Sequence, residues 1–367
     1  MFSFFKEGVD YKKFIRFYER YERYLIPASL LVGIIVDAIL FSSVDFVFAF
    51  VVLTLHFLVS GMTIAFIHLY NAGYFRLRGL RLLRVVAPLI LQYTFGALLS
   101  GFLIFYWFSS TFTASWPFIL IIVALILSND LLKRYYLWLY VQVGVYFFIT
   151  FSLGVLILPF IFKSVSVAVF LAGGILSLFI IALYLYLLSR YLPRVKESAT
   201  RFMVIVGIIF IGMNSLYFTN IIPPIPLTLW EAELAHSVER ISGDYLLEIE
   251  DTKISDLFWL QDRIRVTDGG RAFFFSSVFA PAWLGTDIVH HWQYYDDAVG
   301  QWRTRTKVAF PIVGGREEGY RGYSFINDPQ PGRWRVLVEN SRGQVIGKDN
   351  FRVIKVNGRV NTVERVY

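Results

Sequence analysis

The sequence predicts a membrane protein of two parts: an all-α bundle of seven transmembrane helices and, after it, an all-β, immunoglobulin-like antiparallel sandwich. Of the 367 residues, 56% are hydrophobic and 17% are charged, whereas a soluble domain has about 45–50% apolar and about 25% charged residues. Charge is also divided unevenly, since residues 1–222 carry 17 Lys/Arg and 8 Asp/Glu whereas residues 223–367 carry 18 and 19. Long apolar runs stop near residue 222, where short β-branched and aromatic runs begin.

Residues 1–24 are expected to form a cytoplasmic amphipathic segment. Aromatic residues at helical spacing, among them Phe14, Phe17 and Tyr21, alternate with Lys and Arg. Such a helix can lie on the inner leaflet through its rings and anionic lipid, or it can simply extend the first span with a solvated charged face. The segment lacks the pattern of a cleavable signal peptide.

Residues 25–222 divide into seven apolar stretches, each long enough to cross a hydrocarbon core that needs about 20 helical residues. The predicted spans are 25–43, 46–69, 85–108, 116–132, 137–162, 165–189 and 202–222. The fourth begins beside Pro117 and ends at Asn129 and Asp130, so a re-entrant segment and a six-span protein are the alternative.

The loop charges predict the orientation of these spans. With a cytoplasmic N-terminus, the inner segments hold 16 Lys/Arg and the short outer loops hold only Lys163. Because positive residues accumulate on the cytoplasmic side, this count favours seven spans and an extracytoplasmic C-terminal region.

Polar residues inside spans are costly in hydrocarbon and are therefore candidate site residues. Asp37 and His56 lie on two spans joined by a tight hairpin, about 10 Å and about 17 Å below its turn at 1.5 Å per residue. Gln92 and Asn214 extend this set to an intramembrane polar cluster of Asp37, His56, Gln92 and Asn214. It can line a proton or substrate path, or it can join helices by hydrogen bonds.

Residues 223–242 contain Pro223, Pro224 and Pro226, which prevent a continuing helix. This stretch is predicted to be an exit and connector, followed by the β-sandwich at 243–367. In that domain Trp334, Val336 and Val338 alternate with Arg335 and Leu337, which indicates a strand with one buried face. We expect Phe351 in the same core, and a hairpin turn at residues 340–343.

The soluble half also resembles a known family. The stretches FAPAWLGTDIVHHW, GYRGYS and GRWRVLVENSRGQVIGKDNFRV, within residues 273–354, are similar to the bacterial domain of unknown function 2914, often found at the end of multi-span proteins. The matching positions are His290, Trp292, Gly319, Arg321, Ser324, Trp334, Gly343, Gly347 and Phe351. The resemblance implies a bacterial envelope protein, and it implies no activity. Together with the predicted spans and loop charges, it leads us to expect a multi-pass protein of the bacterial inner membrane with its C-terminal domain in the periplasm.

The residues of this half predict neither a cofactor nor a metal. Cysteine is absent, which excludes thiolate zinc sites, and the adjacent His290 and His291 face opposite sides of a strand. Hydrolase, nucleotide and dinucleotide motifs are missing. Aromatic and arginine residues are dense, however, and four of them are predicted to form a partner-binding surface: Trp292, Tyr294, Tyr320 and Arg321.

The sequence thus predicts a non-enzymatic inner-membrane protein whose sandwich binds an envelope partner, either a protein subunit or a glycan. Membrane lipids are further partners, and nucleic acid is not expected because the soluble part has no excess of positive charge. A transporter or lipid-handling protein that uses the intramembrane polar cluster is the alternative. A third is an enzyme on a lipid-linked substrate at the outer membrane face, with His290 in acid/base chemistry.

Overall fold

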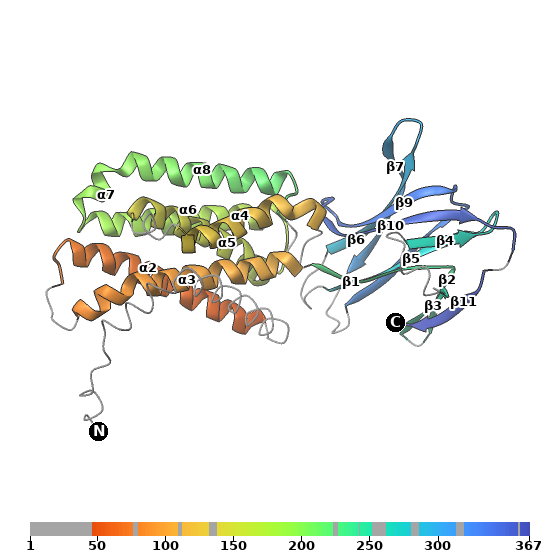
Figure 1. Cartoon of the computed structure of the whole chain (residues 1–367), viewed down its shortest axis with the longest axis horizontal. Coiled ribbons are helices and arrows are strands. Elements are labelled where there is room, and N and C mark those ends of the chain that lie inside the picture. The colour runs from red at the N-terminus through yellow and green to blue at the C-terminus, as the bar shows by residue number, and fades with distance from the viewer. Residues whose placement is uncertain are drawn as a thin grey trace, which may run out of the picture. The chain divides into compact units, whose positions relative to one another are not determined.

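The computed structural model describes residues 46–75, 80–108, 112–131, 138–222, 227–241, 243–251, 262–279, 286–312, 319–358 and 360–367. In these ranges a helical region is followed by an all-β region (Figure 1). The helices are α2 (Phe46–Asn71), α3 (Leu80–Phe108), α4 (Phe112–Leu131), α5 (Leu139–Phe162), α6 (Val167–Ser189), α7 (Pro193–Glu197) and α8 (Ala199–Phe218).

Five of the described helices, α2, α3, α5, α6 and α8, are long and apolar enough to cross a membrane. The predicted fourth span forms α4, but its described apolar part, Ser115–Asn129, is shorter than the about 20 residues that a span needs. The amphipathic segment, the predicted first span and Asp37 lie outside the described residues. The described residues therefore give five candidate spans where seven were predicted for the chain.

The chain divides into two compact units, of which the first comprises residues 1–104, 121–153 and 177–209. Within it, α2, α5 and α6 meet at Gly61. The Tyr184 hydroxyl donates a hydrogen bond to the Gly61 carbonyl (2.8 Å), and a Cβ atom on Gly61 would clash with the Tyr146 hydroxyl group. Tyr146 also stacks on Phe57. Glycine fits here because the Tyr146 side chain occupies the space that a side chain on residue 61 would take.

The second unit comprises residues 105–120, 154–176 and 210–367. In its helical part α5 and α6 approach each other through backbone, since a Cβ atom on Gly154 would lie 3.2 Å from the carbonyl oxygen of Gly173. Small residues permit such close packing of membrane helices. A Cβ atom on Gly173 would in turn lie 3.2 Å from the carbonyl carbon of Gly154, so the close approach involves both glycines.

The β region has eleven described strands. They are β1 (Thr228–Ala235), β2 (Ser237–Ile241), β3 (Asp244–Glu250), β4 (Asp262–Val266), β5 (Arg271–Phe279), β6 (Thr286–Asp296), β7 (Gln301–Ile312), β8 (Tyr320–Asn327), β9 (Gly332–Asn340), β10 (Val345–Lys355) and β11 (Thr362–Val366). They form three sheets, in the orders β1-β5-β8, β4-β10-β9-β6-β7 and β11-β3-β2. All described pairs are antiparallel except β4 with β10.

The sheets form three layers because β5 is buried on both faces. Phe274 belongs to the core shared with the five-stranded sheet, and its neighbour Phe275 belongs to the core shared with β2 and β3. A strand buried on two faces typically has a continuous apolar run, as at residues 272–275. The predicted two-sheet sandwich is therefore corrected: the region is all-β, with a third sheet and one parallel pair.

The predicted sandwich core is confirmed. Trp334, Val336, Val338 and Phe351 are all at most 3% exposed. The predicted hairpin turn is also present between β9 and β10, where the Gly343 amide donates to the Asn340 carbonyl (2.9 Å) and Gly343 has a φ of +76°. This conformation favours glycine.

The β region begins earlier than the sequence indicates. Strands β1 and β2 lie within residues 227–241, in the stretch assigned to an exit and connector. Their alternation is weak because β1 carries Glu231 and Glu233 on a half-exposed surface.

Candidate functional site

The residues of the predicted intramembrane cluster that the structure describes are held by separate hydrogen bonds. On α2, Nδ1 of His56 lies 2.8 Å from the Val52 carbonyl oxygen, and on α8 the Asn214 amide donates to the Phe210 carbonyl at 2.8 Å. Both bonds stay within one helix. Gln92 instead joins α3 to α4, because its side chain donates to the Asn129 carbonyl (3.3 Å).

A further interhelical contact joins α2 to α5. Nε2 of His68 lies 2.7 Å from Oε1 of Gln142, a fully buried side chain. The predicted intramembrane polar cluster does not contain this pair, although both are polar residues in predicted spans. The contact, like that of Gln92, joins neighbouring helices.

The predicted partner-binding surface is not formed as one patch. Trp292 is fully buried and donates its indole N–H to the Ser324 hydroxyl (2.8 Å), and Tyr320 is 8% exposed. Tyr294 packs against Trp334 beside the same core. On the middle sheet, Arg321 forms an ion pair with Asp244. Because even-numbered residues of β6 point inward, Trp292 and Tyr294 belong mainly to the core.

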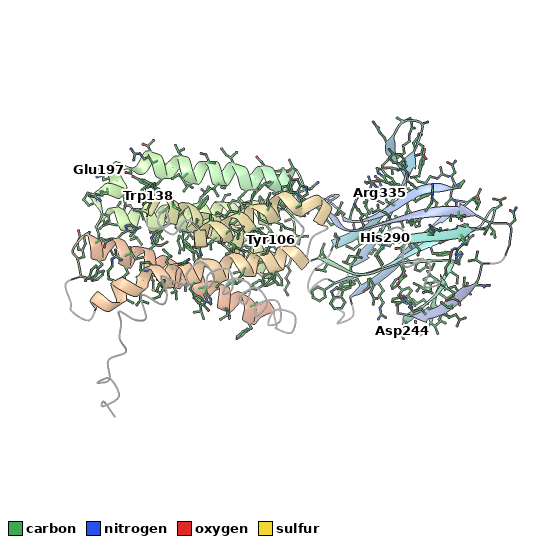
Figure 2. All side chains as sticks on the ribbon, in the orientation of Figure 1. Tyr106, Trp138, Glu197, Asp244, His290 and Arg335 are labelled. Carbon is green, nitrogen blue, oxygen red and sulfur yellow. The ribbon has the colours of Figure 1, made fainter. Side chains whose placement is uncertain are left out.

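His290 and His291 face opposite sides of β6, as the sequence predicts. His290 is fully buried between the Ser276 and Ser324 hydroxyls, at 2.7 Å and 2.9 Å, inside the β region (Figure 2). Burial lowers the pKa of His290 to about 3. The imidazole is therefore neutral at physiological pH and enclosed, which does not suit acid/base chemistry on an external substrate.

The opposite side of the five-stranded sheet carries a different composition. We define the outer face as the face of this sheet that points away from Trp334, Val336 and Val338. The register of the described strands places seven cations there, against the carboxylates of Asp287 and Glu339: Arg263, Arg265, Lys307, Arg333, Arg335, Lys348 and Arg352. The outer face is strongly basic.

Three of these cations are in direct register on adjacent strands. Arg352 of β10 is paired with Arg263 of β4 on one side and with Arg333 of β9 on the other. Neighbouring strands are about 4.8 Å apart, so the three side chains start from a row that crosses the sheet. Like charges directly opposite each other destabilise a sheet. Asp297 offsets part of this repulsion by pairing with Arg333 (2.5 Å).

Aromatic rings hold two guanidinium groups of the outer face. The Arg333 guanidinium lies 3.8 Å from the centre of the Tyr295 ring, and that of Arg335 lies 4.3 Å from the centre of the Trp302 ring. The two rings also contact each other edge to face at 5.2 Å. Cation–π stacking orients the planar guanidinium and leaves its edge available for acceptor groups.

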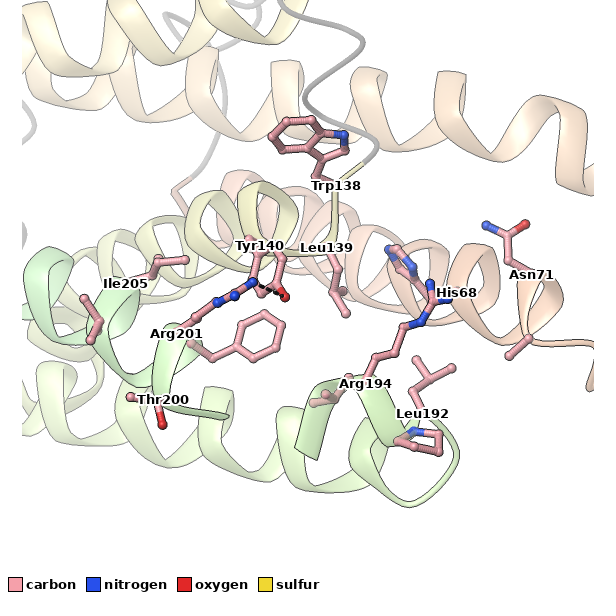
Figure 3. Close-up of a pocket in the computed structure, with 15 residues that line it drawn as sticks. His68, Asn71, Trp138, Leu139, Tyr140, Leu192, Arg194, Thr200, Arg201 and Ile205 are labelled. Carbon is pink, nitrogen blue, oxygen red and sulfur yellow. Dashed lines mark hydrogen bonds between the residues drawn. The ribbon is translucent and has the colours of Figure 1, made fainter. Parts of the chain in front are cut away.

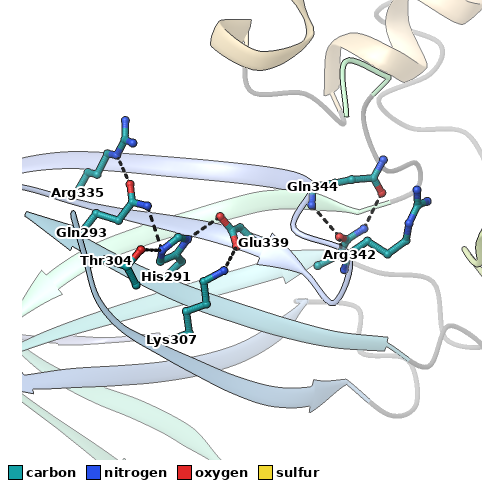
Figure 4. A network of polar contacts seen from close by, with 9 residues as sticks. His291, Gln293, Thr304, Lys307, Arg335, Glu339, Arg342 and Gln344 are labelled. Carbon is teal, nitrogen blue, oxygen red and sulfur yellow. Dashed lines mark hydrogen bonds and ion pairs between the residues drawn. The ribbon is translucent and has the colours of Figure 1, made fainter. Parts of the chain in front are cut away.

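A polar network on the outer face includes Arg335 (Figure 4). Nδ1 of His291 lies 2.9 Å from Glu339, and its Nε2 lies 2.7 Å from the Thr304 hydroxyl. Arg335 donates to the side-chain oxygen of Gln293 (2.7 Å). Partial burial lowers the pKa of Arg335, and the charge of Glu339 opposes this shift. Gln293, whose amide nitrogen lies 3.0 Å from Nε2 of His291, links Arg335 to this network.

Charge is segregated within the β region, although its total is close to zero. Strands β1, β2, β3 and β11 carry seven carboxylates and two cations: Glu231, Glu233, Glu239, Asp244, Glu248, Glu250 and Glu364, with Arg240 and Arg365. One of these carboxylates, Glu250, reaches Arg265 at 2.6 Å. The basic outer face therefore has an acidic counterpart on other strands of the same region.

Five apolar helices followed by an all-β region define the class of this chain, a multi-span membrane protein with a C-terminal β domain. Within it, residues 285–353 match the family described as protein of unknown function (DUF2914). This match, over β6 to most of β10, confirms the resemblance found in the sequence. It includes the candidate outer face except the β4 arginines, and its description states no activity.

Other comparisons add little. No curated protein matches the chain. Among solved structures, a β-glucosidase from Listeria innocua in complex with gluconolactone aligns at 11% identity over 36% of this chain and 16% of that chain, with a TM-score of 0.20. The Pseudomonas fluorescens alkylpurine DNA glycosylase AlkC, bound to DNA containing an abasic site analog, aligns at 10% identity over 74% and 87%, with a TM-score of 0.21. Scores this low carry no argument about fold or function.

Proposed function

We propose that the protein is a non-enzymatic binding protein of the bacterial inner membrane, which presents its β domain in the periplasm to an anionic glycan of the envelope. The row of Arg263, Arg352 and Arg333 is the observation that carries this proposal. Like charges in direct register are unfavourable in a sheet, and such a row offers a line of guanidinium groups to an anionic partner. Guanidinium groups bind carboxylates and phosphates through paired N–H donors.

A glycan is favoured over a protein subunit by the composition of the outer face. The centre of a protein interface is usually apolar and depleted of charged residues, whereas this surface contains seven cations. A linear polymer with regularly spaced acidic groups matches a row of arginines across a sheet. The rings of Tyr295 and Trp302 stack on Arg333 and Arg335, which orients these guanidinium groups for binding acidic groups of the glycan.

The binding test uses the full chain in detergent and polygalacturonate as the probe, with neutral dextran as the uncharged polymer. The variant R263Q/R333Q/R352Q removes the row. Its matched control, R240Q/R271Q/R365Q, removes three cations from β2, β5 and β11. We expect the first variant to lose at least ten-fold in affinity while the control stays near wild type, and we expect salt to weaken binding.

Equal losses in the two variants would show attraction by net charge alone and would refute the proposal. Binding of polyglutamate without binding of polygalacturonate would instead indicate an acidic protein partner.

The proposed topology has a cytoplasmic N-terminus and seven crossings. The loop charges and the five candidate spans support it, with α4 and residues 25–43 as the two further crossings. Reporter fusions after Arg84, Lys163, Arg194 and Tyr367 are expected to read inside, outside, inside and outside. A cytoplasmic signal from the Tyr367 fusion would refute the glycan proposal, because the β domain would then not be exposed to the periplasm.

Transport through the intramembrane cluster is the alternative function. The bond of Gln92 to Asn129 supports the joining of helices instead, whereas His56 and Asn214 bond to their own helices.

A further inference from the structure

A cavity of about 1140 Å³ lies at one end of the helices, within the first unit (Figure 3). The end of α2, the start of α5, α7 and the start of α8 surround it. All these helix ends belong to the side that the loop charges assign to the cytoplasm. All of its lining residues belong to the helical part of the chain.

Two arginines line the cavity from the α7–α8 side. Arg194 extends toward His68 of α2, and Arg201 extends toward Tyr140 of α5 (Figure 3). Nη1 of Arg201 lies 3.5 Å from the Tyr140 hydroxyl, which is also 2.8 Å from the Ser198 hydroxyl. The start of α8 adds the positive end of its helix dipole. This part of the wall attracts negative charge.

The rest of the wall is mostly apolar. It is formed by these side chains: Leu139, Leu192, Val195, Phe202, Val204 and Ile205. Trp138 lies at the rim, and aromatic residues of this kind are typical of the level of lipid headgroups. A free anion would leave the apolar wall in contact with water. An amphiphile with one anionic end satisfies both parts.

We propose that this cavity binds the phosphate-bearing headgroup of an anionic phospholipid, with Arg194 and Arg201 on the phosphate and the apolar residues against the glycerol and upper acyl chains. Arg194 lies in α7, within the connection between α6 and α8, and Arg201 lies in the first turn of α8. A bound phosphate would therefore hold α7 and the start of α8 against α2 and α5.

The test measures lipid adducts on the full chain by native mass spectrometry in neutral detergent. Dihexanoyl phosphatidylglycerol is the anionic probe, and dihexanoyl phosphatidylcholine and inorganic phosphate are compared with it. The variant R194Q/R201Q removes both cations from the wall. Its matched control, R190Q/K196Q, removes two exposed cations from the same end of the bundle that do not line the cavity.

We expect the phosphatidylglycerol adduct to fall at least ten-fold in R194Q/R201Q and to change less than about two-fold in the control. Thr200→Trp, which fills part of the cavity from an exposed position without changing charge, should also reduce the adduct, so the test survives if the double variant folds poorly. Equal loss in the control, equal binding of phosphatidylcholine, or displacement by equimolar inorganic phosphate would overturn the proposal.

Discussion

Replacing Asp349 tests how the β domain tolerates an acid beside its core. Asp349 on β10 is paired with buried Val336, so its side chain points inward from the five-stranded sheet. Burial, and then the negative charges of Asp262 and Glu233, raise the pKa of Asp349 from 3.8 to about 7. The folded domain thus keeps this proton at a pH where the unfolded chain has lost it.

The sign of the pH dependence follows from proton binding. Between about pH 4 and pH 7 the folded state binds more protons than the unfolded state, so Asp349 lowers the stability of the domain as pH rises through that range. The shift of about 3 pKa units, at about 1.36 kcal/mol per unit, gives a cost of about 4 kcal/mol above pH 7. Asp349→Asn removes this cost and should stabilise the domain at pH 8 while changing little at pH 4.

Hydrogen exchange of β9 and β10 peptides in the full chain measures this difference, with variant and wild type compared at each pH. Asp328→Asn provides a control of opposite sign, because hydrogen bonds from Lys355 and the Gly269 amide lower the pKa of the Asp328 carboxyl. A protection difference for Asp349→Asn that is the same at pH 5 and pH 8 would refute the reasoning.

Three further substitutions test the packing. Trp292→Ala should destabilise the β domain by about 3–5 kcal/mol, as large aromatic core deletions do. A thermal melt that shows a loss of stability below about 1 kcal/mol would contradict the assignment of Trp292 to the core. Gly154→Leu should lower the melting temperature of the full chain in detergent by separating α5 from α6, whereas Gly207→Leu, whose Cβ meets no atom within 4 Å, should not; equal effects contradict the close contact. Gly347→Ala should reduce hydrogen-exchange protection of β1, because its Cβ would clash with the Leu229 side chain; unchanged protection contradicts this.

Membrane character and much of the β core could be predicted from the sequence because both depend on local patterns. A run of about 20 apolar residues is suited to cross hydrocarbon whatever its neighbours are. The alternation of Trp334, Val336 and Val338 with Arg335 and Leu337 likewise indicates one buried face. The turn at Gly343 follows from backbone conformation within four residues.

The candidate site could not be predicted in the same way, because it depends on register between strands far apart in the chain. Arg263 and Arg352 are 89 positions apart and become neighbours only through the parallel pair of β10 and β4. The net charge of residues 223–367 is −1, which conceals a basic face and an acidic set of strands. The net charge of a segment sums over all faces of the folded region, whereas a binding partner contacts only one face.

The sequence by itself determined that apolar helices precede a β domain, and it determined which positions of β9 are buried, since hydrophobic length and period are properties of single segments. Tertiary structure decided the rest. Trp292 is a core residue because the face of β6 that carries it is covered by β5. Arg333 is part of a basic face because β9 pairs with β10. The third sheet likewise packs on the second face of β5, where it buries Phe275. These outcomes depend on which surfaces meet, and no single segment contains that information.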